Sequence, residues 1–274
     1  MLSLSAGDGA RRVPFDRPAT VHSSTDGLTP DSEYPSKYSL KRFQESYSSL
    51  KSIRLCGVKR HRCNGALCAR CSPKRQRRHR RELMAALAAS KPVYALLWTA
   101  TIASTPERPL GELWSDLDKL NAYMVSGSWL SSRVDGYVRS IEIERTPSGW
   151  HPHAHTLLVF RNKLSRTDAV KLAREIQARW LRSADLRGIA ASAKGQRVQV
   201  VPMGQLSTVV DYITKSHMTT RSSRTPGTVT PAMLLGSAYR GDADALDLLT
   251  ELERSSYRRR TWQPGGMLTR SSSS

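Results

Sequence analysis

Acidic residues are scarce in this chain. Its 274 residues include 23 Asp and Glu against 43 Lys and Arg, which gives a net charge of +20. So large an excess of positive charge favours a polyanionic partner, with nucleic acid before a membrane surface. The membrane interpretation is weaker because no segment near either end pairs an apolar face with a basic face. A basic protein that is merely soluble is the remaining alternative.

Long hydrophobic runs are also missing. No stretch of about 18 apolar residues occurs, so we expect no membrane span. The first residues lack the basic and apolar regions of a secretory signal, so we expect a cytoplasmic protein. Hydrophobic residues still make up 39% of the chain, which permits a packed core and excludes a wholly disordered or collagen-like chain. The length allows one large domain or two small ones.

Cysteine is rare, and its few copies are clustered. In a chain without a secretory signal, such a cluster indicates metal binding rather than disulfide bonds. Four thiolates suit tetrahedral Zn²⁺, so we predict a structural zinc site in which His61 or His79 could replace one thiol. Four buried free thiols are the alternative. The predicted ligands are Cys56, Cys63, Cys68 and Cys71.

The cysteines lie in a strongly basic segment. Residues 51–81 contain twelve Lys and Arg and no Asp or Glu. Pro73 opens a predicted helix over 74–90 whose apolar end should pack while its basic end stays in solvent. We interpret residues 51–90 as a small module whose cations meet DNA phosphates, which gives affinity without sequence readout. Residues 1–50 begin with a segment rich in Ser, Thr, Pro and Gly and are predicted to form a flexible tail.

From residue 93 onward the apolar periods alternate between strand and helix. Strands are predicted over 93–102, 136–144, 150–160 and 197–203. Three helices are predicted among these strands: one over 110–130, a second that begins after an N-cap at Thr167, and a third over 206–216. This order matches the split βαβ, ferredoxin-like layout, an α+β fold with an antiparallel sheet and helices on one face. We take 91–220 as this domain and 221–274 as a helical C-terminal region with a basic, Ser-rich tail.

Three histidines give the densest chemical signal. His151, His153 and His155 alternate along a predicted strand and therefore share one face. A turn centred between residues 147 and 148 would place Glu142 opposite His153 and beside His155. One carboxylate and two imidazoles suit Mg²⁺ or Mn²⁺ acting on a phosphate, with Zn²⁺ as an alternative. If the pairing of the two strands shifted by two residues, Glu144 would take the place of Glu142. The alternative to a metal site is a chance cluster of polar residues at a sheet edge.

A tyrosine follows the fourth predicted strand. Tyr212 and Lys215 are three residues apart, so both project from one helix face. A tyrosine oxygen can attack a phosphodiester when a metal polarises the phosphate and a cation eases loss of the phenol proton. Such attack would leave a phosphotyrosyl–DNA link and a free 3′-hydroxyl. Most tyrosines in this pattern only pack, but the neighbouring histidine strand favours the catalytic interpretation.

Together these motifs resemble the rolling-circle plasmid replication initiators, the single-tyrosine branch of the HUH endonuclease superfamily. The resemblance covers roughly residues 56–268. It is carried by LWTATI at 97–102, IEI at 141–143, WHPHAHTL at 150–157 and DYITK at 211–215. It implies that His153 and His155 are metal ligands, with Glu142 as the third. It also implies that Tyr212 is the nucleophile and Lys215 its helper.

The resemblance implies an enzyme, a metal-dependent DNA nickase and strand transferase that starts rolling-circle replication at an origin. Origin DNA, a host helicase and a polymerase are then the expected partners, and Mg²⁺ or Mn²⁺ the catalytic cofactor. Some relatives carry an acidic residue one turn before the tyrosine, where this chain has Thr208, so the residue that serves termination is open. The alternatives are an HUH transposase or mobilisation relaxase, and a non-enzymatic zinc DNA-binding regulator.

Overall fold

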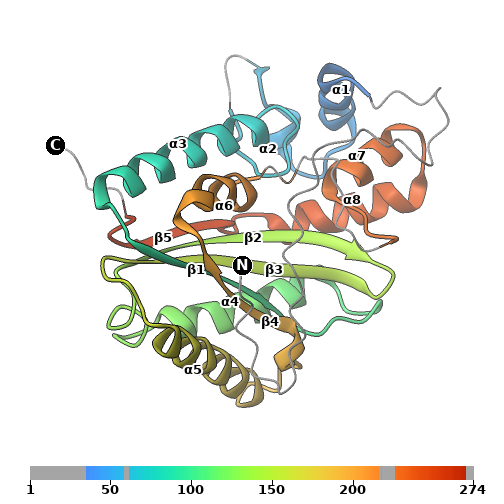
Figure 1. Ribbon diagram of the computed structural model, residues 1–274. Helices are drawn as coiled ribbons and strands as arrows, with labels where there is room; N and C mark the ends of the chain where they lie inside the picture. The colour runs from blue at the N-terminus through green and yellow to red at the C-terminus, as the bar shows by residue number, and fades with distance from the viewer. Residues whose placement is uncertain (1–34, 59–61, 216, 218–225, 270–274) are drawn as a thin grey trace.

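The computed structural model describes residues 35–58, 62–215, 217 and 226–269. A five-stranded antiparallel sheet lies at its centre, in the strand order β4-β1-β3-β2-β5 (Figure 1). The strands are β1 (Tyr94–Thr101), β2 (Gly136–Thr146), β3 (Gly149–Phe160), β4 (Gln196–Val201) and β5 (Trp262–Gly266). The predicted α+β class and antiparallel sheet are confirmed.

Helices precede, interrupt and follow the strands. They are α1 (Lys37–Tyr47), α2 (Lys51–Arg54), α3 (Ser72–Ser90), α4 (Leu110–Val125), α5 (Arg166–Asp185), α6 (Leu206–Ile213), α7 (Pro231–Tyr239) and α8 (Ala243–Ser256). Two short 3-10 turns, η2 (Ala193–Gly195) and η3 (Met203–Gln205), flank β4. Within the described ranges, none of the helices has both the length and the hydropathy to cross a membrane.

Helices cover both faces of the sheet, which corrects the prediction of helices on one face. The long helices α4 and α5 pack on one face, around Trp98 and Ile141. The opposite face is covered by α3 and α6, on the other side of the sheet from α4 and α5 in Figure 1. Leu83 of α3 and Val210 of α6 are buried there against Leu157 of β3. Each of these two helices has an apolar stripe, and the second face of the sheet offers the apolar surface on which that stripe is buried.

The hairpin of β2 and β3 has the predicted register. Glu142 opposes His153, and Glu144 opposes His151. Thr146 pairs with Gly149 across a two-residue loop. Gly149 has φ +97°, and a Cβ on it would clash with the backbone of Thr105, so this position requires glycine. A tight loop of fixed length leaves one register in which the apolar residues all face inward.

The prediction of a flexible N-terminal tail over residues 1–50 is wrong for residues 37–47. Residues 1–34 lie outside the described residues, but α1 is a regular helix within the predicted tail. Ser36 caps it by accepting a hydrogen bond from the Ser39 backbone. Leu40 is buried, and Gln44 donates to the Leu67 carbonyl and accepts from the backbone of Ala69. The helix is therefore fixed by contacts with the cysteine segment, which local composition does not reveal.

Two further boundaries differ from the predictions. The helix expected to begin after Thr167 begins after Ser165, whose hydroxyl accepts the Asp168 amide at 3.0 Å. The C-terminal region is not only helical, because β5 pairs with β2 at the sheet edge. The sequence of β5, WQPGG, lacks the alternation of a strand, and a Cβ on Gly265 would clash with the ring of Tyr137.

Candidate active site and cysteine cluster

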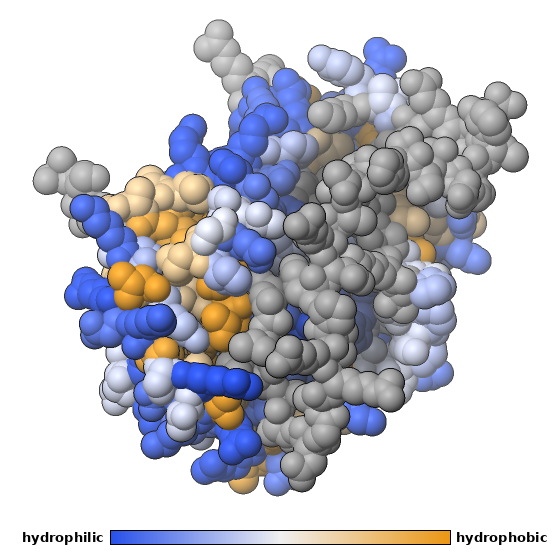
Figure 2. All heavy atoms as spheres, viewed as in Figure 1, coloured by the Kyte–Doolittle hydropathy of each residue, from blue (hydrophilic) through white to orange (hydrophobic). Residues whose placement is uncertain are grey.

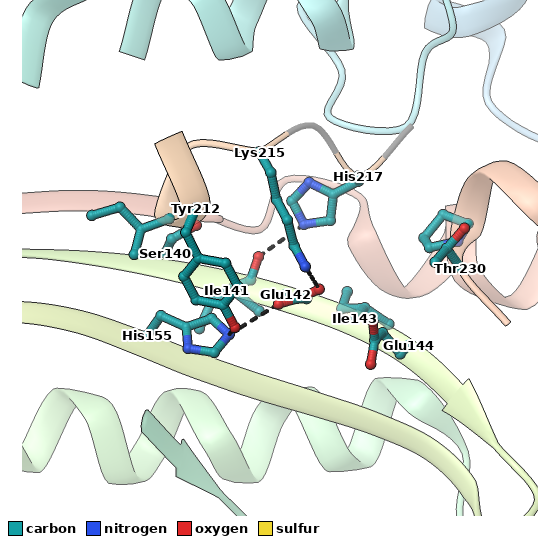
Figure 3. A pocket seen from close by; sticks show the side chains of 12 residues that line it. Ser140, Ile141, Glu142, Ile143, Glu144, His155, Tyr212, Lys215, His217 and Thr230 are labelled. Atoms are coloured by element: carbon teal, nitrogen blue, oxygen red, sulfur yellow. Dashed lines mark hydrogen bonds and ion pairs between the residues drawn. The ribbon is translucent and has the colours of Figure 1, made fainter. Parts of the chain in front are cut away.

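The sheet face beneath α3 and α6 changes from apolar to polar along its strands. At the polar end it borders a pocket that is half open to solvent, which we call the Tyr212 pocket (Figure 3). Strands β2 and β3 supply its floor, and the end of α6 supplies its other wall. Its lining includes Ser140, Glu142, Glu144, His155, Tyr212, Lys215 and His217. The structure thus brings Glu142, His155, Tyr212 and Lys215 together, as the sequence predicts.

His155 is the centre of this group. Its Nε2 lies 2.9 Å from Glu142 Oε2 and 3.2 Å from the Tyr212 hydroxyl. Its Nδ1 lies 3.0 Å from Thr99 Oγ1 on the neighbouring strand β1. Lys215 forms an ion pair with the other oxygen of Glu142. Tyr212 is 41% exposed, yet its hydroxyl points into the pocket toward His155 (Figure 3).

Opposing effects set the protonation states of these groups. Burial would raise the pKa of Glu142, but its hydrogen bond to His155 and the positive charge of Lys215 outweigh burial and hold that pKa well below its usual range. Burial lowers the pKa of His155, although its hydrogen bond to the Glu142 carboxylate acts in the opposite direction. Burial and the negative charges of Glu142 and Glu144 raise the pKa of Tyr212. At neutral pH the site therefore holds an ionised carboxylate, a neutral imidazole and a protonated phenol.

The His153 ring lies beside that of His155, with 5.9 Å between ring centroids, but its nitrogen contacts are with other residues. Its Nε2 lies 3.3 Å from His151 Nδ1 and 3.7 Å from Glu144 Oε2. Although Glu142 opposes His153, its carboxylate leans diagonally to His155, a contact that the sheet geometry allows. The three predicted ligands do not form a closed set here, and Glu144 stands beside His153.

Two contacts of the site were missed by sequence reasoning. Thr99 orients His155, although only its cross-strand pairing in the fold places it there. His217 is enclosed in the pocket and lies 2.8 Å from the Ile141 carbonyl through Nε2. Burial lowers the pKa of His217. Thr99 lies in the LWTATI segment that carries the family resemblance, but only the pairing of β1 with β3 shows its contact with His155. His217 reaches the site through tertiary packing and belongs to none of the motifs.

The tyrosine helix ends earlier than predicted and is tied to α3. Helix α6 ends at Ile213, and Lys215 follows it, with its amide bonded to the Tyr212 carbonyl at 3.3 Å. Ser216, the predicted end, lies outside the described residues. Asp211 turns away from the pocket and forms an ion pair with Arg80 of α3. Tyr212 is therefore positioned by a helix that rests on the sheet and is linked to the basic helix.

The four cysteines converge on one point. Their sulfur atoms all lie within 4.8 Å of one another, and the Cys56 and Cys71 sulfurs are 3.4 Å apart. About 3.8 Å separates the sulfurs of a tetrahedral zinc–thiolate site with Zn–S bonds of about 2.3 Å. A hydrogen bond from Cys63, with backbone N–H groups of the Cys68–Cys71 turn, lowers the pKa of Cys68 to about 5 despite burial. The donor set and its spacing fit a metal such as zinc.

The other candidate ligands do not join this cluster. His79 stacks on Trp262, with 4.6 Å between ring centroids, and His61 lies outside the described residues. Among the residues described, the four thiols are the group of His, Cys, Asp and Glu side chains close enough to hold one ion. Cys71 directly precedes α3, so the cluster fixes the start of the basic helix.

The buried histidines predict that the protein loses stability in acid. Burial lowers the pKa of His155 and His217, and burial with the charge of His153 lowers that of His151 to about 4. The unfolded chain takes up protons near pH 6.5, before the folded protein does, so the free energy of unfolding falls as pH drops below about 6.5. Urea unfolding between about pH 7.5 and pH 5, without added divalent cations, measures this slope. His151→Gln should make the slope shallower, and an unchanged midpoint across this range would contradict the prediction.

Comparison with known proteins identifies the family to which the chain belongs. Residues 55–274 match the family described as "Replication protein", so the match spans most of the chain. The chain belongs to this replication protein family, and the family indicates a plasmid replication initiator that acts on origin DNA. No curated protein and no solved structure gives a significant match.

Proposed function

We propose that the chain is a metal-dependent DNA nickase and strand transferase of the single-tyrosine HUH type, which starts rolling-circle replication of a plasmid. The observation that carries the proposal is the Tyr212 hydroxyl, 3.2 Å from a buried imidazole that also contacts an ionised carboxylate. Family membership supports the replication role. The strand order β4-β1-β3-β2, with α4 and α5 as crossing helices, supports a ferredoxin-like core.

The reaction exchanges one phosphodiester for another. The Tyr212 oxygen attacks the scissile phosphorus, the bond from phosphorus to the 3′ oxygen breaks, and the departing strand takes up a proton as its 3′-hydroxyl. The phenol proton must leave, and Lys215, whose Nζ lies 5.1 Å from the Tyr212 ring centroid, offers positive charge to the phenolate. Because the phosphate bond is kept in the phosphotyrosine, rejoining needs no nucleotide cofactor.

The donor atoms at the site are of the kinds that a divalent cation takes, although His153 faces His151 and Glu144 while His155 faces Glu142. Glu142 and Glu144 offer carboxylate oxygens beside the imidazole of His155, and such a mixed set of oxygen and nitrogen donors is one that Mn²⁺ or Mg²⁺ accepts. His155 and Glu142 would hold the ion, and His153 would join after turning from His151 toward its cross-strand partner. A bound cation would polarise the scissile phosphate and offset the carboxylate charges that now raise the Tyr212 pKa. Thr99 would keep the His155 ring in its orientation.

The cysteine cluster has a structural role in this proposal. Zinc held by the four thiols would fix the start of α3 and present its basic half to DNA. Hydrophilic side chains gather over the N-terminal half of α3, while apolar ones gather toward its C-terminal end (Figure 2). Lys and Arg there would bind phosphates without reading sequence.

A covalent adduct tests the function directly. We expect the protein, incubated with Mn²⁺ and single-stranded DNA from its cognate plasmid origin, to form a protein–DNA adduct that resists denaturation. Tyr212→Phe should abolish the adduct, since phenylalanine lacks the attacking oxygen while keeping the ring. Tyr239→Phe, at an exposed tyrosine on α7, is the matched control and should leave the adduct intact.

Two outcomes would contradict the proposal. An adduct that persists in Tyr212→Phe would show that another residue is the nucleophile. If the protein binds origin DNA but does not nick it with any divalent metal ion present, a non-enzymatic zinc regulator would be favoured. A nick mapped at transposon ends or a transfer origin would instead place the same chemistry in a transposase or relaxase.

A further inference from the structure

A second pocket, half open to solvent, adjoins the Tyr212 pocket. The two pockets share a wall made by Ser140, Ile213, Lys215 and His217. The far side of the second pocket is built by the cysteine segment, α3 and the start of β5. We call it the Arg75 pocket, because Arg75 of α3 lines it.

The Arg75 pocket differs in charge from its neighbour. Glu142 and Glu144 line the Tyr212 pocket, whereas no Asp or Glu is among the described residues that line the Arg75 pocket. Arg75 itself has neutral partners, since it donates to the Asn64 carbonyl at 3.2 Å and to Thr261 Oγ1 at 3.1 Å. Across the described ranges, no carboxylate lies within ion-pair distance of it.

This arrangement leaves a partly buried cation without a counter-charge. Burial and the neighbouring charge of Arg78 lower the pKa of Arg75, the direction expected when no anion compensates. A guanidinium with neutral acceptors on one side is suited to receive a phosphate on the other. Lys215 on the shared wall adds a second cation.

An aromatic pair stands beside this cation. Trp262, the first residue of β5, stacks on His79 of α3 with 4.6 Å between ring centroids and 17° between planes, and both rings line the pocket. Trp262 is only partly buried. Cations along the backbone and aromatic rings against the bases are the two elements of single-strand DNA sites.

We propose that the Arg75 pocket binds the nucleotide next to the scissile phosphate, with the phosphate of that nucleotide on Arg75 and its base against Trp262. This inference rests on the proposed nicking function, which places the scissile phosphate in the adjoining pocket. Because the two pockets adjoin at Ser140, Lys215 and His217, a strand held at Tyr212 would continue into the Arg75 pocket. Ala66 and Ser72 also line it, so the cysteine module contributes to substrate binding as well as to folding.

Equilibrium binding of a single-stranded dT oligonucleotide, without divalent cations, tests the phosphate contact. Arg75→Gln should weaken binding by about tenfold and reduce the slope of log affinity against log salt by about one. Arg75→Lys should restore the slope because it keeps the charge. Arg174→Gln is the matched control, since Arg174 is exposed on α5 and lies outside the pocket, and its effect should be smaller.

Tryptophan fluorescence tests the base contact in the same titration. DNA should quench the emission, and Trp262→Phe should remove most of the quenching. Trp98, Trp114, Trp150 and Trp180 are all buried. The partly buried Trp129 lies outside the pocket, beneath Arg133 and Arg179. Equal effects of Arg75→Gln and Arg174→Gln, together with unchanged quenching in Trp262→Phe, would overturn the inference. If Arg75→Gln does not fold, the other two variants test the inference. Arg75→Lys should keep the salt dependence of the parent, and Trp262→Phe should lose most of the quenching. A Tyr212-dependent adduct alongside these negative results would leave the nickase proposal standing and reject only the Arg75 pocket.

Discussion

Replacing His155 with alanine is expected to lower the rate of plasmid nicking by about a thousandfold, the equivalent of about 4 kcal/mol of transition-state stabilisation. The reason is that His155 contacts Thr99, Glu142 and the Tyr212 hydroxyl at once. Its loss would remove a metal ligand, leave Glu142 with Lys215 alone and free the phenol from its position. Conversion of supercoiled origin plasmid to the open circle, with Mn²⁺ present, measures the rate.

Two other variants separate the ligand role from general damage to the pocket. Thr99→Val keeps the side-chain shape and removes the orienting hydroxyl, so it should weaken metal affinity by roughly 10–100-fold and recover at high Mn²⁺. His151→Ala lies on the same face but outside the proposed ligand set, so its effect should be less than about tenfold. A rate in His155→Ala close to that of His151→Ala would remove His155 from the proposed metal site.

The central site could be predicted from the sequence because its geometry is set locally. The alternation of β3 places its three histidines on one face, and the two-residue loop fixes which residues of β2 lie opposite. Tyr212 follows from its place after β4, on a helix with a strong apolar stripe that must rest on the sheet. In each case a short stretch of chain determines the outcome.

The missed features depend on contacts between distant segments. Strand β5 forms although its sequence has no strand period, because β2 offers an edge and Gly265 leaves room for Tyr137. The contact of Thr99 with His155 depends on the pairing of β1 with β3, which lie far apart in the sequence. The covering of the second sheet face depends on α3, whose position is set by the cysteine cluster. Periodicity alone carries no information on these partners.

Replacing Cys68 with serine is expected to abolish stoichiometric zinc binding and to destabilise the whole chain, because structural zinc sites contribute apparent binding energies of about 10–16 kcal/mol, comparable with the net stability of a domain. The cluster is not an isolated appendage. Leu67 and Ala69, between its ligands, belong to the main core, and Gln44 of α1 bonds to both backbones. Unfolding the cluster would therefore expose core surface and release the start of α3.

Zinc content and thermal unfolding measure this effect, with His79→Gln as the matched control. His79 lies near the cluster in sequence but stacks on Trp262, so its variant should keep one zinc per chain and a melting temperature close to that of the parent. Treatment of the parent with a strong chelator should reproduce the Cys68→Ser result. Full zinc content and unchanged melting in Cys68→Ser would show that the four thiols are packing residues. Because α3 also reaches Asp211 through Arg80, loss of the cluster should weaken nicking even where the sheet survives.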